Sequence, residues 1–153
     1  MFFRNSIENI KAKKIKIFVD MDGVIADYVV GEAKNYDKKR QLHTVIDQLK
    51  EISSFDNVEL FILSISKMDI GVNEKNLWLD VNAPFFKKEN RVIISRESNN
   101  MEKSHKLKCD YIRNVKREQD CKIVVIDDDC DIVHKLKEQN DDIIVLKDTV
   151  FFD

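Results

Sequence analysis

The chain has 153 residues, of which 43% are hydrophobic and 35% charged, with only three glycines and one proline. This length suits one domain that needs no disulfide or zinc staple, and the composition excludes collagen-like, linker-rich and disordered chains. The 26 Lys and Arg residues against 28 Asp and Glu residues leave a net charge of −2. Such a balance offers no sequence-independent attraction to nucleic acid or to an anionic membrane.

The cysteines and the apolar runs indicate where such a protein resides. Cys109, Cys121 and Cys130 form no CxxC pair, and their odd number is more typical of a reduced cytosolic protein than of a secreted one. No apolar run approaches the roughly 18–20 residues that a membrane span needs, and the N-terminus has no apolar core of signal-peptide length. We therefore expect a cytoplasmic protein, with one domain over residues 1–153 and a core over about residues 14–147.

Five short runs rich in Ile and Val are apolar on both faces, as strands of a buried parallel sheet are. In chain order they are Ile15–Val19, Val58–Leu63, Arg91–Ser95, Lys122–Ile126 and Asp142–Leu146. Apolar residues at helical spacing predict helices over Lys38–Ile52, Asn73–Val81, Leu107–Val115 and Ile132–Leu136. Strands that alternate with helices form right-handed βαβ units. We predict an α/β fold, a Rossmann-like three-layer α/β/α sandwich with a five-stranded parallel sheet.

Acidic residues follow two of these strands. Asp20 and Asp22 come directly after the first strand, and Asp127-Asp128-Asp129 follow the fourth. Gly23 permits a tight turn after the first pair. Ligands of such sheets bind beyond the carboxyl ends of the strands, and gathering acids there is unfavourable without a cation or protons. Carboxylate and carbonyl oxygens suit Mg²⁺, so the sequence predicts a magnesium site.

A hydroxyl and a lysine complete the pattern. Ser64 follows the second strand, and Lys103, Lys106 and Lys108 lie between the third and fourth strands, where one could reach a phosphate. Each residue also has a structural explanation. An aspartate after a strand is often a turn former, and Asp129 or Asp131 could simply cap the helix that begins near Cys130.

The run from Phe18 to Tyr28, FVDMDGVIADY, resembles the first motif of the haloacid dehalogenase (HAD) superfamily of aspartyl-phosphate phosphotransferases. The resemblance covers the chain from Ile15 to about Leu146. Within the superfamily the run is most similar to the 5'(3')-deoxyribonucleotidase branch and its small bacterial and phage relatives. Glu74–Asp80 (EKNLWLD), followed by Pro84, resembles the EKxxWL…P segment of that branch.

The resemblance implies a role for each polar residue. Asp20 would be the nucleophile, and Asp22 the acid/base, with a pKa raised by its environment. Ser64 would contact the phosphoryl oxygens, and Lys108 would be the motif lysine, with Lys106 as second choice. Mg²⁺ would be held by the side chains of Asp20 and Asp127 and by the backbone carbonyl of Asp22, with Asp128 acting directly or through water.

Room for a substrate-covering cap is small. Only Ile25–Asn57 separate the first motif from the second strand, and Lys67–Asn90 is also short. We therefore expect a minimal cap or none, over an open site. The polar segment Met101–His105 is expected to form a loop near the site, where His105 would be either a substrate contact or a surface histidine.

These observations predict a Mg²⁺-dependent phosphomonoester hydrolase acting on a small phosphorylated substrate, with 5'-nucleotidase activity on a nucleoside monophosphate as one form. The alternative is a non-catalytic HAD-like phospholigand-binding or scaffold domain, which the missing cap suggests and the Asp20/Asp22 pair argues against. A signalling receiver domain is disfavoured, because receivers carry their phosphoacceptor after the third strand, whereas the second acidic run of this chain follows the fourth strand. The glycines at 23, 31 and 71 cannot form the GxGxxG of a dehydrogenase. Substrate and oligomeric state stay open.

Overall fold

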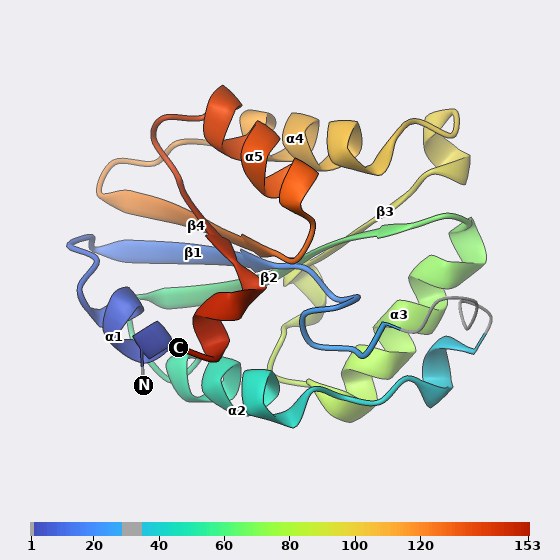
Figure 1. The fold of residues 1–153 in the computed structure, drawn as a ribbon, viewed down its shortest axis with the longest axis horizontal. Helices are drawn as coiled ribbons and strands as arrows, with labels where there is room; N and C mark the ends of the chain where they lie inside the picture. The colour runs from blue at the N-terminus through green and yellow to red at the C-terminus, as the bar shows by residue number, and fades with distance from the viewer. Residues whose placement is uncertain (1, 29–34) are drawn as a thin grey trace.

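A computed structural model describes residues 2–28 and 35–153 (Figure 1). Its sheet has five parallel strands in the order β3-β2-β1-β4-β5. The strands are β1 (Lys14–Val19), β2 (Val58–Ser66), β3 (Arg91–Ser95), β4 (Cys121–Asp127) and β5 (Ile144–Lys147). The predicted five-stranded parallel sheet is confirmed. Strand β2 continues past its predicted end, so Ser64 lies within the strand, paired with Ile93 of β3, rather than after it.

The strand order determines where a ligand can bind. In the order 3-2-1-4-5 the chain reverses direction across the sheet between β1 and β4, and ligands bind beyond the carboxyl ends of the strands at such a switch point. Asp20 follows β1 and Asp127 ends β4, so both lie at this point. The receiver fold has the order 2-1-3-4-5, and the observed order excludes it.

Helices cover both faces of the sheet (Figure 1). On one face lie α1 (Phe2–Glu8), α2 (His43–Ile52) and α3 (Asp69–Asn82), and on the other lie α4 (Ser104–Asn114) and α5 (Cys130–Gln139). Side chains of β1 alternate between the two cores: Ile17 and Val19 pack toward α1–α3, and Phe18 packs toward α4 and α5. This alternation gives the predicted three layers. The 3₁₀ turns are η1 (Tyr36–Lys38), η2 (Lys88–Asn90), η3 (Glu97–Asn99) and η4 (Asp148–Phe151).

Helix α2 begins at His43, so the predicted start at Lys38 is wrong. The residues before it pair with the chain that leaves the first motif: Asp27 N donates to Arg40 O at 2.8 Å and Leu42 N donates to Ile25 O at 2.8 Å. Because these amides and carbonyls are used in an extended pairing, residues 40–42 cannot continue a helix. The pairing holds Lys39 close to the end of β1.

Two other helices start earlier than predicted, and one helix was not predicted at all. Helix α3 begins at Asp69 rather than Asn73, and Asp69 N donates to Glu97 at 2.9 Å in place of an earlier helical turn. Helix α4 includes Ser104 and His105, which were predicted to lie in a loop. Helix α1 was not predicted, and it is held by buried Phe3, whose ring lies 4.5 Å from that of Phe151. Among the described helices, none has the length and apolar character to cross a membrane.

Candidate active site

The turn after β1 places the first two aspartates. Asp20 N donates to Ile126 O of β4 at 3.0 Å, which fixes Asp20 beside the end of that strand. The Met21 carbonyl then accepts from the amides of Val24, Ile25 and Ala26 at 3.0–3.2 Å, closing a compact loop. Gly23 in this loop has a φ of 83°, a conformation that glycine adopts without strain. Although Asp20 and Asp22 lie two residues apart on this loop, their side chains contact different residues.

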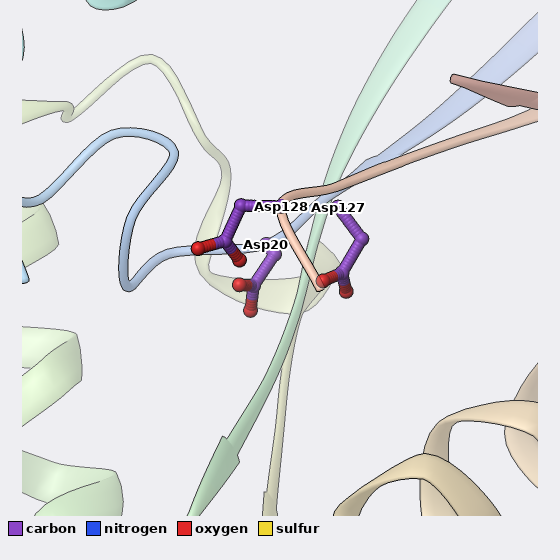
Figure 2. A group of neighbouring side chains, drawn as sticks. All are labelled: Asp20, Asp127 and Asp128. Atoms are coloured by element: carbon purple, nitrogen blue, oxygen red, sulfur yellow. The ribbon is translucent and has the colours of Figure 1, made fainter. Parts of the chain in front are cut away.

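Asp20, Asp127 and Asp128 form an acid cluster at the ends of β1 and β4 (Figure 2). One carboxylate oxygen of each lies within 4.8 Å of the others. Lys108, from α4, donates to Asp20 Oδ1 at 2.7 Å and to Asp127 Oδ2 at 2.6 Å. Its side chain is only 3% exposed. Three acids and one buried ammonium therefore share a small volume.

The charges of this acid cluster are not balanced. Burial and then the charge of Asp20 raise the pKa of Asp127 to about 6, and the same two causes raise that of Asp128 to about 7. Burial opposes the charged form of Lys108, but Asp20 and Asp127 outweigh it and raise the pKa of the ammonium. Hard carboxylate oxygens with excess negative charge are the surroundings that Mg²⁺ prefers. The donor set thus fits the predicted metal.

Asp22 lies outside this cluster, between two lysines. Lys39 Nζ donates to Asp22 Oδ1 and Lys75 Nζ to Asp22 Oδ2, both at 2.7 Å. Burial alone would raise the pKa of Asp22, but Lys75 and Lys39 outweigh burial and lower it. This direction contradicts the expectation of a raised pKa at Asp22. Its carboxylate is not among the clustered metal donors, and its backbone carbonyl stays a predicted ligand.

Ser64 is buried beside the same lysine. Its Oγ accepts from Lys75 Nζ at 2.8 Å, which brings the predicted hydroxyl close to Asp22. A phosphoryl contact by Ser64 remains a prediction. The structure thus holds these predicted site residues in two groups: Lys108 with Asp20, Asp127 and Asp128, and Ser64 with Asp22.

An aromatic wall lies beside Asp22. Lys39 Nζ lies 4.7 Å from the centre of the Tyr36 ring, and Lys75 Nζ lies 5.3 Å from it. Trp78 packs edge-on against the same ring, with centroids 6.1 Å apart. Burial and then the charge of Asp22 raise the pKa of the Tyr36 phenol, and within the described residues its buried hydroxyl has no hydrogen-bond partner. The charged network around Asp22 is therefore shielded from water on this side.

A cavity of about 430 Å³ opens over the acid cluster. It is lined by Asp20, Asp22, Tyr28, Ile65, Ser104, Lys108, Asp127, Asp128, Asp129 and Ile132. A larger depression of about 690 Å³ lies around the start of α2. None of the clustered acids lines it, and a large volume by itself does not indicate a catalytic site. The smaller cavity is the candidate active site.

Three further residues have clear positions. Lys106 lies on the surface of α4, 3.3 Å from Glu102 and from Asp110, so Lys108 is the lysine that reaches the acids. His105 is not among the residues that line the candidate active-site cavity. Asp129 caps α5, accepting from the amides of Asp131 at 2.8 Å and Ile132 at 3.2 Å, so one structural explanation from the sequence is confirmed.

Sequence reasoning did not assign roles to Lys39, Tyr36 or Lys75. Lys75 and Trp78 belong to the EKNLWLD segment, and their spacing of three residues puts them on one helix face. That spacing was the available signal for Lys75. Tyr36 lies in the single 3₁₀ turn η1 and Lys39 directly after it, and a segment this short has no periodicity that could have identified them.

Comparisons with known proteins support the fold. No protein-family profile matches the chain, and a search of curated proteins returns no match. Among solved structures, the chain is similar to the N-terminal part of the protein BF1531 from Bacteroides fragilis, a part described as containing a phosphatase domain complexed with Mg. The match has a TM-score of 0.60 and 18% sequence identity, and covers 95% of this chain and 38% of that chain. At this identity the similarity shows a shared α/β fold.

Proposed function

We propose that this protein is a Mg²⁺-dependent phosphomonoester hydrolase of the HAD type, which acts through an aspartyl-phosphate on Asp20. The observation that carries the proposal is the acid cluster, whose oxygens lie within 4.8 Å of one another and which Lys108 joins at 2.6–2.7 Å. The fold shared with a phosphatase domain that binds Mg supports it. Mg²⁺ would be held by Asp20, Asp127, Asp128 and the Asp22 carbonyl, and when bound it would neutralise charge on the phosphoryl oxygens.

In the first step, Asp20 attacks phosphorus. Its Oδ1 accepts from Lys108, which leaves the other oxygen to form the new P–O bond. The ester P–O bond breaks, and Asp22 donates a proton to the leaving oxygen, so the products are an alcohol and phospho-Asp20. Lys108 offsets the repulsion between the carboxylate and the phosphoryl dianion.

The second step regenerates the carboxylate. A water oxygen attacks phosphorus while Asp22, now ionised, takes the proton of that water. The bond between Asp20 and phosphorus breaks, and inorganic phosphate leaves. Lys39 and Lys75 favour the ionised form of Asp22, which suits this step. For the first step, the negative phosphoryl group beside Asp22 opposes the lysines and favours protonation.

Nucleoside monophosphates are the substrate class that we propose within this activity. Tyr28 lines the cavity with 61% of its surface exposed. An aromatic ring at the mouth of the cavity offers a surface for stacking a base. The similarity of the first motif to the deoxyribonucleotidase branch favours the same class.

The test is phosphate release from p-nitrophenyl phosphate and from a panel of nucleoside monophosphates, with Mg²⁺ and with a chelator. We expect metal-dependent release by the wild-type protein and none by Asp20→Asn. Asp56→Asn, which makes the same change at an exposed position just before β2, is the matched control and should keep full activity. Release that persists in Asp20→Asn contradicts the mechanism. Mg²⁺-dependent binding of a phosphorylated ligand without turnover would favour the non-catalytic alternative.

A further inference from the structure

Lys75 makes an unusually complete set of contacts for a lysine. Its ammonium donates to Asp22 Oδ2 at 2.7 Å, to Ser64 Oγ at 2.8 Å and to the Ile65 carbonyl at 2.8 Å. A lysine has three N–H donors, so the described residues use all of them. The residue is only 4% exposed. Lys75 therefore has no free donor for a substrate.

Lys39 contacts the same carboxylate but is held differently. Its ammonium makes one hydrogen bond to the described side chains, to Asp22 Oδ1, and otherwise faces the rings of Tyr36 and Tyr28 at 4.7 and 5.5 Å. Lys75 joins Asp22 to strand β2, whereas Lys39 joins it to an irregular segment. Of the two lysines, Lys75 is the one attached to a rigid element.

Helix α3 is fixed to the sheet by contacts that do not involve Lys75. Arg91 of β3 donates to the Asn76 carbonyl at 3.2 Å and to Asp80 at 2.6 Å. One turn along from Lys75, Trp78 Nε1 donates to the Lys39 carbonyl at 3.0 Å. The position of the Lys75 backbone is thus set by its neighbours, and removing its ammonium should leave the helix in place.

We infer that Lys75 is a positioning residue for the proposed reaction, which holds the carboxylate of Asp22 and the hydroxyl of Ser64 in one fixed arrangement against β2. The inference rests on the proposed function, since Asp22 is the proton donor only within that mechanism. Lys75 touches no reacting atom and acts through Asp22. A small misplacement of an acid can lower a rate by about 10²-fold, so a fixed carboxylate matters most where the leaving oxygen needs a proton.

The test is a double-mutant cycle with Lys75→Met, Asp22→Asn and the double variant, on two substrates. An alkyl phosphate has a poor leaving group that needs the acid, whereas p-nitrophenyl phosphate needs it little. In Lys75→Met we expect kcat/KM to fall about 10²-fold on the alkyl ester and less than about 10-fold on p-nitrophenyl phosphate. In the Asp22→Asn background the cycle follows the single-turnover rate of Asp20 phosphorylation, because hydrolysis of the phosphoenzyme is blocked, and the same change should cost less than about 3-fold. Lys87→Met, at an exposed position after α3, is the control for loss of an ammonium.

Three outcomes would overturn the role of Lys75. The first is an equal fall in kcat/KM of Lys75→Met on the two esters, and the second is a double variant whose loss is the product of the two single losses. The third is a raised KM with unchanged kcat in Lys75→Met. The last would mean that Lys75 binds substrate directly. Thermal unfolding of each variant reports folding, and Lys75→Gln, which keeps two N–H donors, takes the place of Lys75→Met if that variant does not fold. If the wild-type protein is active and any of these outcomes is found, only the positioning role of Lys75 is contradicted. If the wild-type protein is inactive, the proposed function is contradicted, and the role of Lys75 with it.

Discussion

Asp20 and Asp22 leave the same turn two residues apart, yet opposite charge balances surround them. Around Asp20, three acids share one buried ammonium, Lys108. Around Asp22, one acid is held by two ammonium groups, Lys39 and Lys75. The single ammonium of Lys108 does not neutralise the three carboxylates around it. The two ammonium groups beside Asp22 more than neutralise its one carboxylate. A local excess of acid marks the place for a cation, and a local excess of base marks a carboxylate held in position.

The two groups should respond to pH in opposite directions. The pKa of Asp22 is lowered on folding, so its contribution to stability is present above its ordinary pKa and is lost as the pH falls. The pKa values of Asp127 and Asp128 are raised to about 6 and about 7, so the folded protein holds extra protons below these values. The stability that these two acids contribute is therefore lost as the pH rises toward neutrality.

The largest effect expected from a single lysine is at Lys108. Lys108→Met removes the ammonium that, among the described residues, pairs with Asp20 and Asp127, and kcat/KM with saturating Mg²⁺ should fall about 10³-fold. Lys106→Met, on the same helix but turned to the surface, should stay within about 2-fold of wild type. Steady-state kinetics on p-nitrophenyl phosphate measure both. A larger loss in Lys106→Met would mean that the wrong lysine has been placed in the site.

Gly23 leaves room for the side chain of Asp128. A Cβ at Gly23 would lie 2.0 Å from Asp128 Oδ2, and its φ of 83° disfavours other residues. Gly23→Ala should therefore displace Asp128 and raise the Mg²⁺ concentration needed for half-maximal activity by about 10-fold, since a carboxylate ligand is misplaced. Gly71→Ala is the matched control, because its Cβ would meet Ser66 Oγ at 2.2 Å, away from the acids. An unchanged Mg²⁺ dependence in Gly23→Ala would remove Asp128 from the metal site.

Mg²⁺ should offset the pH dependence of the acid cluster. Without metal, the free energy of unfolding should fall by about 1–3 kcal/mol from pH 5 to pH 8, because Asp127 and Asp128 ionise against Asp20. Millimolar Mg²⁺ should raise the melting temperature more at pH 8 than at pH 5, since protons and metal compete for the same oxygens. Calorimetry at both pH values measures this, with Asp128→Asn as a variant in which the difference shrinks. An equal or larger shift at pH 5 would contradict the charge imbalance.

The smallest effect concerns Asp129, an acid of the same run with a local role. Asp129→Ala removes the two hydrogen bonds that cap α5 and should cost about 1 kcal/mol of stability. Asp129→Asn keeps an acceptor oxygen and should recover most of this loss. Chemical denaturation of the three proteins measures it. If Asp129→Asn is as unstable as Asp129→Ala, the charge rather than the cap explains the effect.

The sheet and the acid cluster could be predicted because they depend on local patterns. Apolar runs such as Lys122–Ile126 specify buried parallel strands, and acids that follow β1 and β4 must meet at one edge once those strands are neighbours. The start of α2 could not be predicted, because the pairing of residues 25–27 with residues 40–42 competes with the helix and has no periodicity.

The residues that surround Asp22 could not be predicted from the sequence either. Periodicity places Lys75 on α3, but not the direction of its side chain toward β2. The lowered pKa of Asp22 depends on Lys39 as well, whose position is set by the hydrogen bond from Trp78. Charges that converge from three separate segments are a property of the folded chain, so the sign of the pKa change at Asp22 could not be predicted.

The most direct test of the account is the intact mass of the protein, quenched with acid during turnover of p-nitrophenyl phosphate with Mg²⁺. We predict that one phosphoryl group is added to the wild-type protein, that it accumulates in Asp22→Asn because water is no longer activated, and that it is absent from Asp20→Asn. Peptide mapping should place it on Asp20. Turnover with no phosphoprotein in Asp22→Asn, or a phosphoryl group that persists in Asp20→Asn, would contradict the central claim.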